Sequence, residues 1–380
     1  MTATIEVNMA ALSDTVREYD AQGIHRTGTA VDAASAEWLV GRVRALGLEA
    51  ETIRYPFRRV IPDEVCQLRA GNVVVDGYPL TDSLLPASGS AIEGRLSLTD
   101  GPGVIRAMRV NQHRDEAQFE QARLAGNAAV IVAVEGDETG HTLLNAWRYR
   151  DPFGPPVLQV PIRTWEQIKE AAQAQTIATL QVGATHEDLT IFNVRARVPG
   201  RDSSLPPLVV LTPRSGWWHC AGERGGGLAV WLELARLIVA EPLESDVVFL
   251  ATTGHEIGYL GIHIFFEADP SLATEARYWL HLGANVGAAD SRLMVRTGDE
   301  DLMEAVRPVF EGATLTPHFD VTARPLGEAG VVAQYGGRFV SYIGAGFPLF
   351  HSVNDRWPQA CDFPSMAAAT EAARAILWSA

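Results

Sequence analysis

Hydrophobic and polar positions follow two periods along the chain, and the changes of period divide it into segments. Apolar residues recur at helical spacing over residues 5–22 and 32–46, where Asp32 precedes the second apolar run as an N-cap does. The next stretch, AETIRYPFRRV, alternates apolar and polar residues as a half-buried strand does. The start of the chain therefore predicts two helices followed by a strand.

From about residue 65 the pattern changes to short β-like runs broken by Gly, Pro, Asp and Ser. These runs include GNVVVDGYPL, GRLSLTDG, AAVIVAVEG and PPVLQVPI, and one helix is predicted at 115–125. We predict a small β-rich domain over 65–185, inserted into a larger domain formed by 1–64 and 186–380.

After residue 200 strands and helices alternate. The predicted strands are LPPLVVLTP, DVVFLATT, ARYWLHLGANVG, RLMVRTG and RFVSYIG; the predicted helices are GGGLAVWLELARLIVA, YLGIHIFFE, DLMEAVRPVF and PSMAAATEAARAILWS. Such alternation is typical of an α/β domain with a mostly parallel sheet flanked by helices.

A charged pair, His255 and Glu256, directly follows the predicted buried strand that ends in FLATT. In open α/β sheets ligands bind outside the carboxyl ends of the strands, so this pair stands where catalytic groups are usual. The alternative is a helix cap, in which Thr253 accepts from the first turn and Glu256 favours the helix dipole.

The net charge of the chain limits the kinds of molecule it is expected to bind. Lys and Arg number 31 against 46 Asp and Glu, which gives a net charge of -15, and no basic run occurs. Nucleic acid and anionic membranes are therefore excluded as partners, and a small or short peptide-like substrate, neutral or cationic, is favoured. No basic segment precedes an apolar core at the amino terminus, so we expect a cytoplasmic protein.

Three cysteines, Cys66, Cys220 and Cys361, lie far apart and form neither a disulfide framework nor a CxxC metal motif. Cys220 precedes a predicted helix, whose amino terminus lowers the pKa of a thiol, and a metal-free relay with His255 and Glu256 is one alternative. The other is a small buried hydrophobic residue.

Four stretches together resemble a known family: TIFNVRARVPG, LVVLTPRSGWWHCAGERGGGLAVWLELAR, VVFLATTGHEIGYLG and GFPLFHSVNDRW. Their order is similar to that of the zinc aminopeptidases, whose relatives include glutaminyl cyclase, the transferrin receptor ectodomain and nicastrin. The segment with AGNAAVIVAVEGD followed by PPVLQV resembles the protease-associated domain that many members carry. The resemblance implies a zinc-exopeptidase-like α/β domain with that insert.

The metal positions that the resemblance implies are degenerate here. Where the family has an early His and Asp, this chain has Thr212 and Arg214, and where it has an Asp after the third strand, this chain has Gly283. These positions include both exclusive ligands of one of the family's two zinc ions.

The positions that serve the other ion keep metal-binding side chains: Glu223, Glu256 and His351. The resemblance to glutaminyl cyclase implies that they hold at most a single catalytic zinc with an open fourth position. His255 stands where the family has its general base, and a neutral imidazole can serve that role.

Five further residues are predicted to bind substrate. Trp217 and Trp218 either wall an apolar pocket or cap the core, and His219 lies on the same loop. His281 points to the face of the missing aspartate, as a replacement group or as a core histidine. Glu328 lies in a segment where the family places substrate-facing polar residues.

We therefore predict a divergent aminopeptidase-like hydrolase or aminoacyl cyclotransferase that acts on an amide or aminoacyl carbonyl. Two alternatives stay open. One is an inactive binding or scaffold protein, as the resemblance to the transferrin receptor and nicastrin implies. The other is a metal-free enzyme that uses His255 and Glu256.

Overall fold

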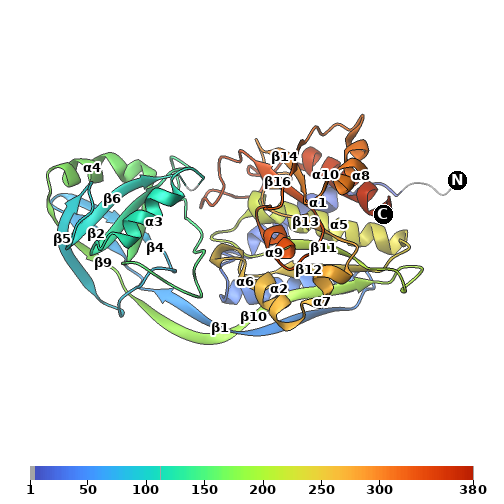
Figure 1. The fold of residues 1–380 in the computed structure, drawn as a ribbon, viewed down its shortest axis with the longest axis horizontal. Helices are drawn as coiled ribbons and strands as arrows, with labels where there is room; N and C mark the ends of the chain where they lie inside the picture. The colour runs from blue at the N-terminus through green and yellow to red at the C-terminus, as the bar shows by residue number, and fades with distance from the viewer. Residues whose placement is uncertain (1–4, 112, 380) are drawn as a thin grey trace.

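The computed structural model describes residues 5–111 and 113–379, which form two bodies joined by a pair of long strands (Figure 1). Each body is built on an eight-stranded sheet. Within the described residues, no helix combines the length and apolar character needed to cross a membrane. The first and last described segments lie on the same body, shown at the right of Figure 1.

The first body has the strand order β1-β10-β12-β11-β13-β16-β14-β15. Its strands are β1 (Ala50–Pro62), β10 (Ala184–Val198), β11 (Leu208–Pro213), β12 (Val247–Thr252), β13 (Tyr278–Leu282), β14 (Arg292–Thr297), β15 (His318–Val321) and β16 (Phe339–Ala345). The four central strands are parallel, as predicted.

The sheet as a whole is mixed, which corrects the expectation of a mostly parallel one. β10 pairs antiparallel with β1 and with β12, and β14 pairs antiparallel with β16. The connection from β13 to β14, residues 283–291, is too short for the crossover helix that a parallel return needs.

Helices cover both faces of this sheet because its central strands are apolar on both sides. Leu208 and Val210 of β11 join a core with the first group of helices, whereas Val209 and Leu211 join a core with the second. The first group is α1 (Met9–Ala21), α2 (Ala30–Arg44), α5 (Gly226–Ala240), α8 (Glu300–Val306) and α10 (Phe363–Trp378). The second group is α6 (Leu260–Ala268), α7 (Ser271–Glu275) and α9 (Glu328–Gln334).

The second body has the strand order β3-β2-β9-β5-β6-β7-β8-β4. Its strands are β2 (Gln67–Ala70), β3 (Val73–Asp76), β4 (Tyr78–Pro79), β5 (Ala91–Ser97), β6 (Val104–Val110), β7 (Ala129–Val134), β8 (Val157–Pro161) and β9 (Ile177–Gln181). Helices α3 (Glu116–Leu124) and α4 (Trp165–Gln173) cover its two faces. Its assignment as a protease-associated domain bounded at 65 and 185 stays a prediction.

Apolar packing fixes the two bodies against each other. One core cluster joins Leu143 and Ala146 of the second body to Trp217, Ile257 and Leu260 of the first. β1 and β10 also pair along their length, from Ala50 opposite Ala196 to Pro62 opposite Ala184, so the link is a two-stranded ribbon.

The glycines at 225–227 allow close packing, since a Cβ on Gly226 would lie 2.0 Å from the Val286 carbonyl oxygen. The N-cap expected at Asp32 is wrong: the cap of α2 is Thr29, whose hydroxyl accepts from the Asp32 amide at 3.1 Å.

Candidate active site

The parallel central strands bring the predicted site residues to one edge of the first sheet. β11, β12 and β13 end at Pro213, Thr252 and Leu282, and the segments after these strands carry most of those residues. Most of the predicted site residues are buried: Trp217, Glu223, His255, Glu256, His281, Glu328 and His351; Trp218 and His219 are half-buried.

A chain of hydrogen bonds links His255 to the sheet. His255 Nδ1 lies 2.8 Å from Glu328 Oε1, and His281 Nε2 lies 3.2 Å from Glu328 Oε2. His281 Nδ1 in turn lies 2.8 Å from the hydroxyl of Ser341. Burial raises the pKa of Glu328, but the contacts with His255 and His281 outweigh it and hold that pKa well below its ordinary value.

This chain of contacts fixes the tautomers. An ionised Glu328 accepts from both imidazoles, so the proton of a neutral His255 is on Nδ1 and its lone pair is on Nε2. The described residues supply no hydrogen-bond partner for that Nε2, and 6% of the His255 side chain is exposed. His255 is therefore oriented as a general base is, with one nitrogen held and the other available.

Two glycines make room for the His281 ring. A Cβ at Gly283 would lie 2.7 Å from His281 Cε1, and one at Gly327 would lie 2.9 Å from the same atom. The imidazole thus fills the space beside position 283, where the resemblance places a ligand. Ser341 pairs with His281 on the neighbouring strand and was not predicted, although a serine within the apolar run RFVSYIG was a usable signal.

Glu256 holds the segment around it in place. Its Oε1 accepts from the Thr27 amide at 2.7 Å and its Oε2 from the Ser215 hydroxyl at 2.8 Å, while that hydroxyl accepts from the His255 amide at 3.2 Å. Neither Thr27 nor Ser215 was predicted, because both are brought in by tertiary packing.

The helix cap considered for this segment is not observed. The Thr253 hydroxyl donates to the Asp32 carboxylate at 3.1 Å, and α6 begins at Leu260 without a side-chain cap bond.

Glu223 pairs with its sequence neighbour. Arg224 Nη2 donates to Glu223 Oε1 at 2.6 Å, and His351 Nε2 lies 3.5 Å from the same oxygen. Burial raises the pKa of Glu223, but the charges of Arg224, His351 and His255 together outweigh it and keep the pKa below its usual value. Burial lowers the pKa of His351 to about 4. Arg224 was not predicted as a site residue. The signal that could have revealed it is a charged residue within a glycine-rich stretch.

The ligand atoms of the predicted zinc site do not converge. Among the described residues, the only group of three His, Cys, Asp or Glu ligand atoms within 4.8 Å of one another is Cys220, Glu223 and Asp355. Glu256 and His351 are outside it. Both Asp355 oxygens accept backbone amides, from Gly222 at 2.6 Å and Glu223 at 2.9 Å.

Protonation also works against zinc in that group. Burial, with the charge of Glu223, raises the pKa of Asp355 to about 8 and that of Cys220 well above its usual value. Zinc requires deprotonated ligands. Because the Arg224 guanidinium already contacts Glu223 at 2.6 Å, the residues present do not fit a zinc ion. Arg214 adds a second buried guanidinium, paired with Asp32 at 2.7 Å.

The aromatic residues of the loop meet the second body. Trp217 is buried and its Nε1 donates to Asn145 Oδ1 at 3.0 Å, so it caps the core between the bodies. Trp218 is half-buried, and its Nε1 donates to the His351 carbonyl at 3.0 Å. The His219 carbonyl lies 3.1 Å from His25 Nδ1.

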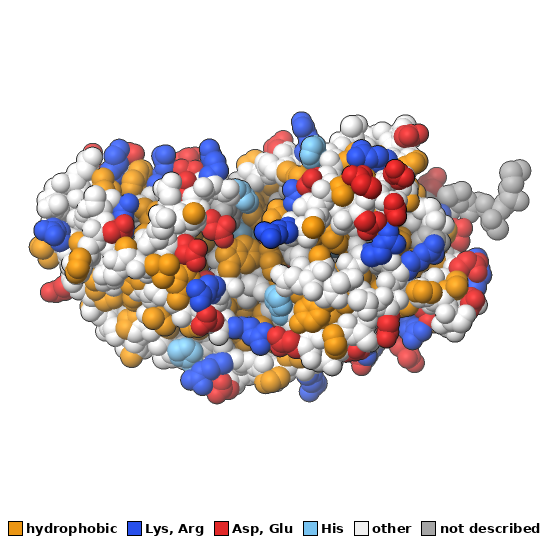
Figure 2. Space-filling model, viewed as in Figure 1, with side chains coloured by type: hydrophobic (Ala, Val, Ile, Leu, Met, Phe, Trp, Pro, Cys, Tyr) orange, Lys and Arg blue, Asp and Glu red, His pale blue; other side chains and the backbone are white. Residues whose placement is uncertain are grey.

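A segment of the second body, residues 137–150, crosses the site; we call it the strap. The Ala146 amide donates to the Glu256 carbonyl at 2.8 Å, and the Leu143 carbonyl lies 2.9 Å from His351 Nδ1. On the face shown in Figure 2 the surface is hollowed between the two bodies, and hydrophobic and histidine side chains line the hollow.

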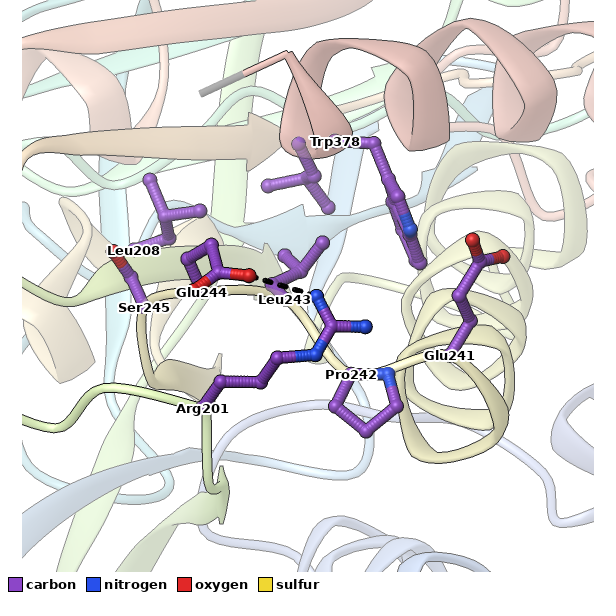
Figure 3. Close-up of a pocket in the computed structure, with 9 residues that line it drawn as sticks. Arg201, Leu208, Glu241, Pro242, Leu243, Glu244, Ser245 and Trp378 are labelled. Atoms are coloured by element: carbon purple, nitrogen blue, oxygen red, sulfur yellow. Dashed lines mark hydrogen bonds and ion pairs between the residues drawn. The ribbon is translucent and has the colours of Figure 1, made fainter.

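A pocket of about 220 Å³ lies elsewhere on the first body (Figure 3). Arg201, Glu244 and Trp378 line it, and Arg201 Nη1 pairs with Glu244 Oε1 at 2.8 Å. Leu208 and Ser245 place it where β11 and β12 begin, at the edge opposite the carboxyl ends. It is therefore separate from the candidate active site.

Solved structures share the fold over nearly the whole chain. An aminopeptidase from Aneurinibacillus sp. matches with a TM-score of 0.74 at 15% identity, over 98% of this chain and 94% of its own. A zinc aminopeptidase from Bacillus subtilis matches with 0.79 at 17% identity, over 98% and 95%. A peptidase M28 precursor from Shewanella amazonensis matches with 0.79 at 15% identity, over 97% and 92%.

The chain therefore has the α/β fold of the zinc aminopeptidases. No family model and no curated protein matches the sequence. Identities this low establish the fold alone, and the chemistry has to be argued from the side chains of this chain.

Proposed function

We propose that the protein is an enzyme that acts on an amide or aminoacyl carbonyl with His255 as its general base. The observation that carries the proposal is the contact between His255 Nδ1 and Glu328 at 2.8 Å, which leaves Nε2 without a partner among the described residues. A carboxylate that fixes one imidazole nitrogen while the other meets substrate is a recurring arrangement in acyl transfer.

The proton path uses only side chains of this chain. His255 Nε2 takes a proton from the attacking water, or from an amine within the substrate, as that group adds to the carbonyl carbon. The imidazolium then returns the proton to the leaving nitrogen as the C–N bond breaks. Glu328 stabilises the transient imidazolium, and His281 with Ser341 keeps Glu328 in place.

The substrate proposed is small and neutral or cationic, in line with the net charge of -15. Trp218, half-buried beside the His351 carbonyl, is the aromatic wall proposed for it. A cytoplasmic location is proposed with it.

The test is turnover by the full chain of aminoacyl anilides and of short peptides with an amino-terminal glutamine. Hydrolysis releases the free amine, whereas cyclisation releases ammonia. His255→Ala is expected to reduce kcat by ~10²–10⁴. The matched control is His263→Ala, which removes a half-buried imidazole of α6 and is expected to leave kcat unchanged. Equal rates in wild type and His255→Ala would contradict the proposal.

The binding or scaffold alternative is favoured by one observation, the strap that lies over the buried His351 and Glu256. Under that alternative, wild type would turn over none of these substrates, and peptide binding would be the same in wild type and His255→Ala.

A further inference from the structure

Two oppositely charged residues adjacent in sequence occupy the centre of the site. Glu223 and Arg224 lie in a π-helical turn, Ala221–Gly225, and their side chains are 1% and 0% exposed. Arg224 Nη2 donates to Glu223 Oε1 at 2.6 Å, and Arg224 Nε donates to the Ser215 carbonyl at 2.9 Å. The guanidinium is therefore held between the Glu223 carboxylate and the segment that follows β11.

The Glu223 carboxylate is surrounded by groups that bind metals. Cys220 Sγ lies 3.7 Å from its Oε2, and His351 Nε2 lies 3.5 Å from its Oε1. Asp355 completes the buried group with Cys220 and Glu223. Yet the cation in contact with the carboxylate is the guanidinium, and His351 Nε2 is buried without a hydrogen-bond partner in the described part of the chain.

We propose that the Arg224 guanidinium takes the place of a divalent cation beside Glu223, so that the protein binds no zinc there until the guanidinium is removed. A buried carboxylate needs a counter-charge, and Arg224 supplies one that is covalently attached. A zinc ion at the same oxygen would meet a fixed positive charge in a buried site, where charges are weakly screened. Without Arg224, the ion would be left to Cys220, Glu223 and Asp355, whose ligand atoms already lie within 4.8 Å of one another.

The first measurement is zinc titration of the full chain after chelator treatment, followed by metal analysis and by the melting temperature. Wild type is expected to retain no zinc, and its Tm is expected not to rise with Zn²⁺. One retained equivalent that is lost in Glu223→Gln would overturn the proposal.

The second measurement uses Arg224→Met, which keeps the length of the side chain and removes its charge. This variant is expected to melt below wild type without metal, to bind one equivalent of Zn²⁺ and to regain Tm when it binds. The matched control is Arg236→Met, since Arg236 pairs with Glu233 at 2.7 Å in α5 outside the Cys220 group. The control is expected to gain no zinc.

The double variant Glu223→Gln/Arg224→Met guards against loss of folding, because it removes both charges. It is expected to fold without zinc and to bind none. Two outcomes overturn the proposal. In the first, Arg224→Met fails to fold even with Zn²⁺ while the double variant folds. In the second, Arg224→Met folds but binds no zinc. None of these readouts uses turnover, so they can fail or succeed independently of the role proposed for His255.

Discussion

At the scale of single residues, the absence of a side chain at Gly283 is coupled to the position of the His281 imidazole. The imidazole of His281 lies beside position 283, where a Cβ would be 2.7 Å from its Cε1, and it reaches Glu328, which in turn contacts His255. Because Gly283, together with Gly327, leaves room for this ring, the glycine is part of the arrangement that holds His255. Restoring a side chain at 283 would displace the ring and the contacts that depend on it.

The first prediction concerns Gly283→Ala. The added methyl group would lie 2.7 Å from His281 Cε1, and overpacking of this kind costs ~1–3 kcal/mol of unfolding free energy. Urea unfolding measures the loss. The control is Gly41→Ala in α2, where a Cβ meets nothing within 4 Å and alanine favours the helix by ~0.5–1 kcal/mol. A Gly283→Ala protein as stable as wild type would contradict the crowding argument.

The second prediction concerns stability in acid. Burial, with the charge of Arg214, lowers the pKa of His25 from 6.5 to about 3, and its ring stacks on Tyr19 at 3.7 Å. The unfolded state takes up the proton first, so stability is retained above pH 6.5 and falls as pH decreases from 6.5 toward 3. The loss from this one group approaches ~1.4 kcal/mol per pH unit.

The variant His25→Phe isolates that contribution, because phenylalanine keeps the stacking and cannot be protonated. We expect its urea-unfolding free energy to fall less steeply than that of wild type between pH 6.5 and 4.5. The comparison is needed because other groups titrate too: burial raises the folded-state pKa of Asp355 to about 8, which adds stability as pH falls toward 3.8. Parallel profiles of the two proteins would show that His25 is not the group involved.

At the scale of elements, periodicity predicted most of the first body, but not the partners of its polar residues. α5, α6 and α10 and the central strands were predicted because their apolar runs are long and regular. The antiparallel direction of β14 was not predicted, since it depends on the length of one connection. Asp32 was taken for a cap because sequence spacing cannot reveal Arg214, which is far along the chain.

The third prediction separates the helix cap formed by Thr29 from the ion pair formed by Asp32 with Arg214. Thr29→Ala removes the observed cap and is expected to cost ~1 kcal/mol of unfolding free energy. Asp32→Asn leaves the buried Arg214 guanidinium without its counter-ion and is expected to cost ~3–5 kcal/mol. Urea unfolding of both variants decides between the roles. A larger loss for Thr29→Ala than for Asp32→Asn would mean that the ion pair contributes less than the cap.

The same limit applies to the site. His255, Glu256, Glu328 and His281 were predicted as site residues, and three of them form one hydrogen-bonded chain, but their roles as catalytic or binding groups stay predictions. Zinc ligands that converge were expected from the family resemblance, which indicates only the positions of residues along the chain. The resemblance carries no information about the Arg224 guanidinium beside Glu223.

At the scale of the whole molecule, the strap joins the second body to the edge of the first that carries the candidate active site. Asp137 Oδ2 accepts from the Ser352 hydroxyl at 2.5 Å and from Asn354 Nδ2 at 2.7 Å. Ser352 directly follows His351, so one carboxylate ties the second body to the segment that carries a central site residue. The Ala146 amide of the strap also donates to the carbonyl of Glu256, the sequence neighbour of His255, so we expect movement of the strap to change access to His255.

The fourth prediction tests that connection with Asp137→Ala. Each lost hydrogen bond to a charged acceptor costs ~1.5–3 kcal/mol, and ~1.4 kcal/mol corresponds to a tenfold change in an equilibrium. We therefore expect amide hydrogen exchange over residues 137–150 to become at least ~10-fold faster, while exchange in α5 stays unchanged. The control is Asp202→Ala, whose carboxylate bonds only locally to Ser204. Unchanged exchange in the strap would mean that the apolar contacts of Leu143 and Ala146 hold it by themselves, and that Asp137 does not control access to the site.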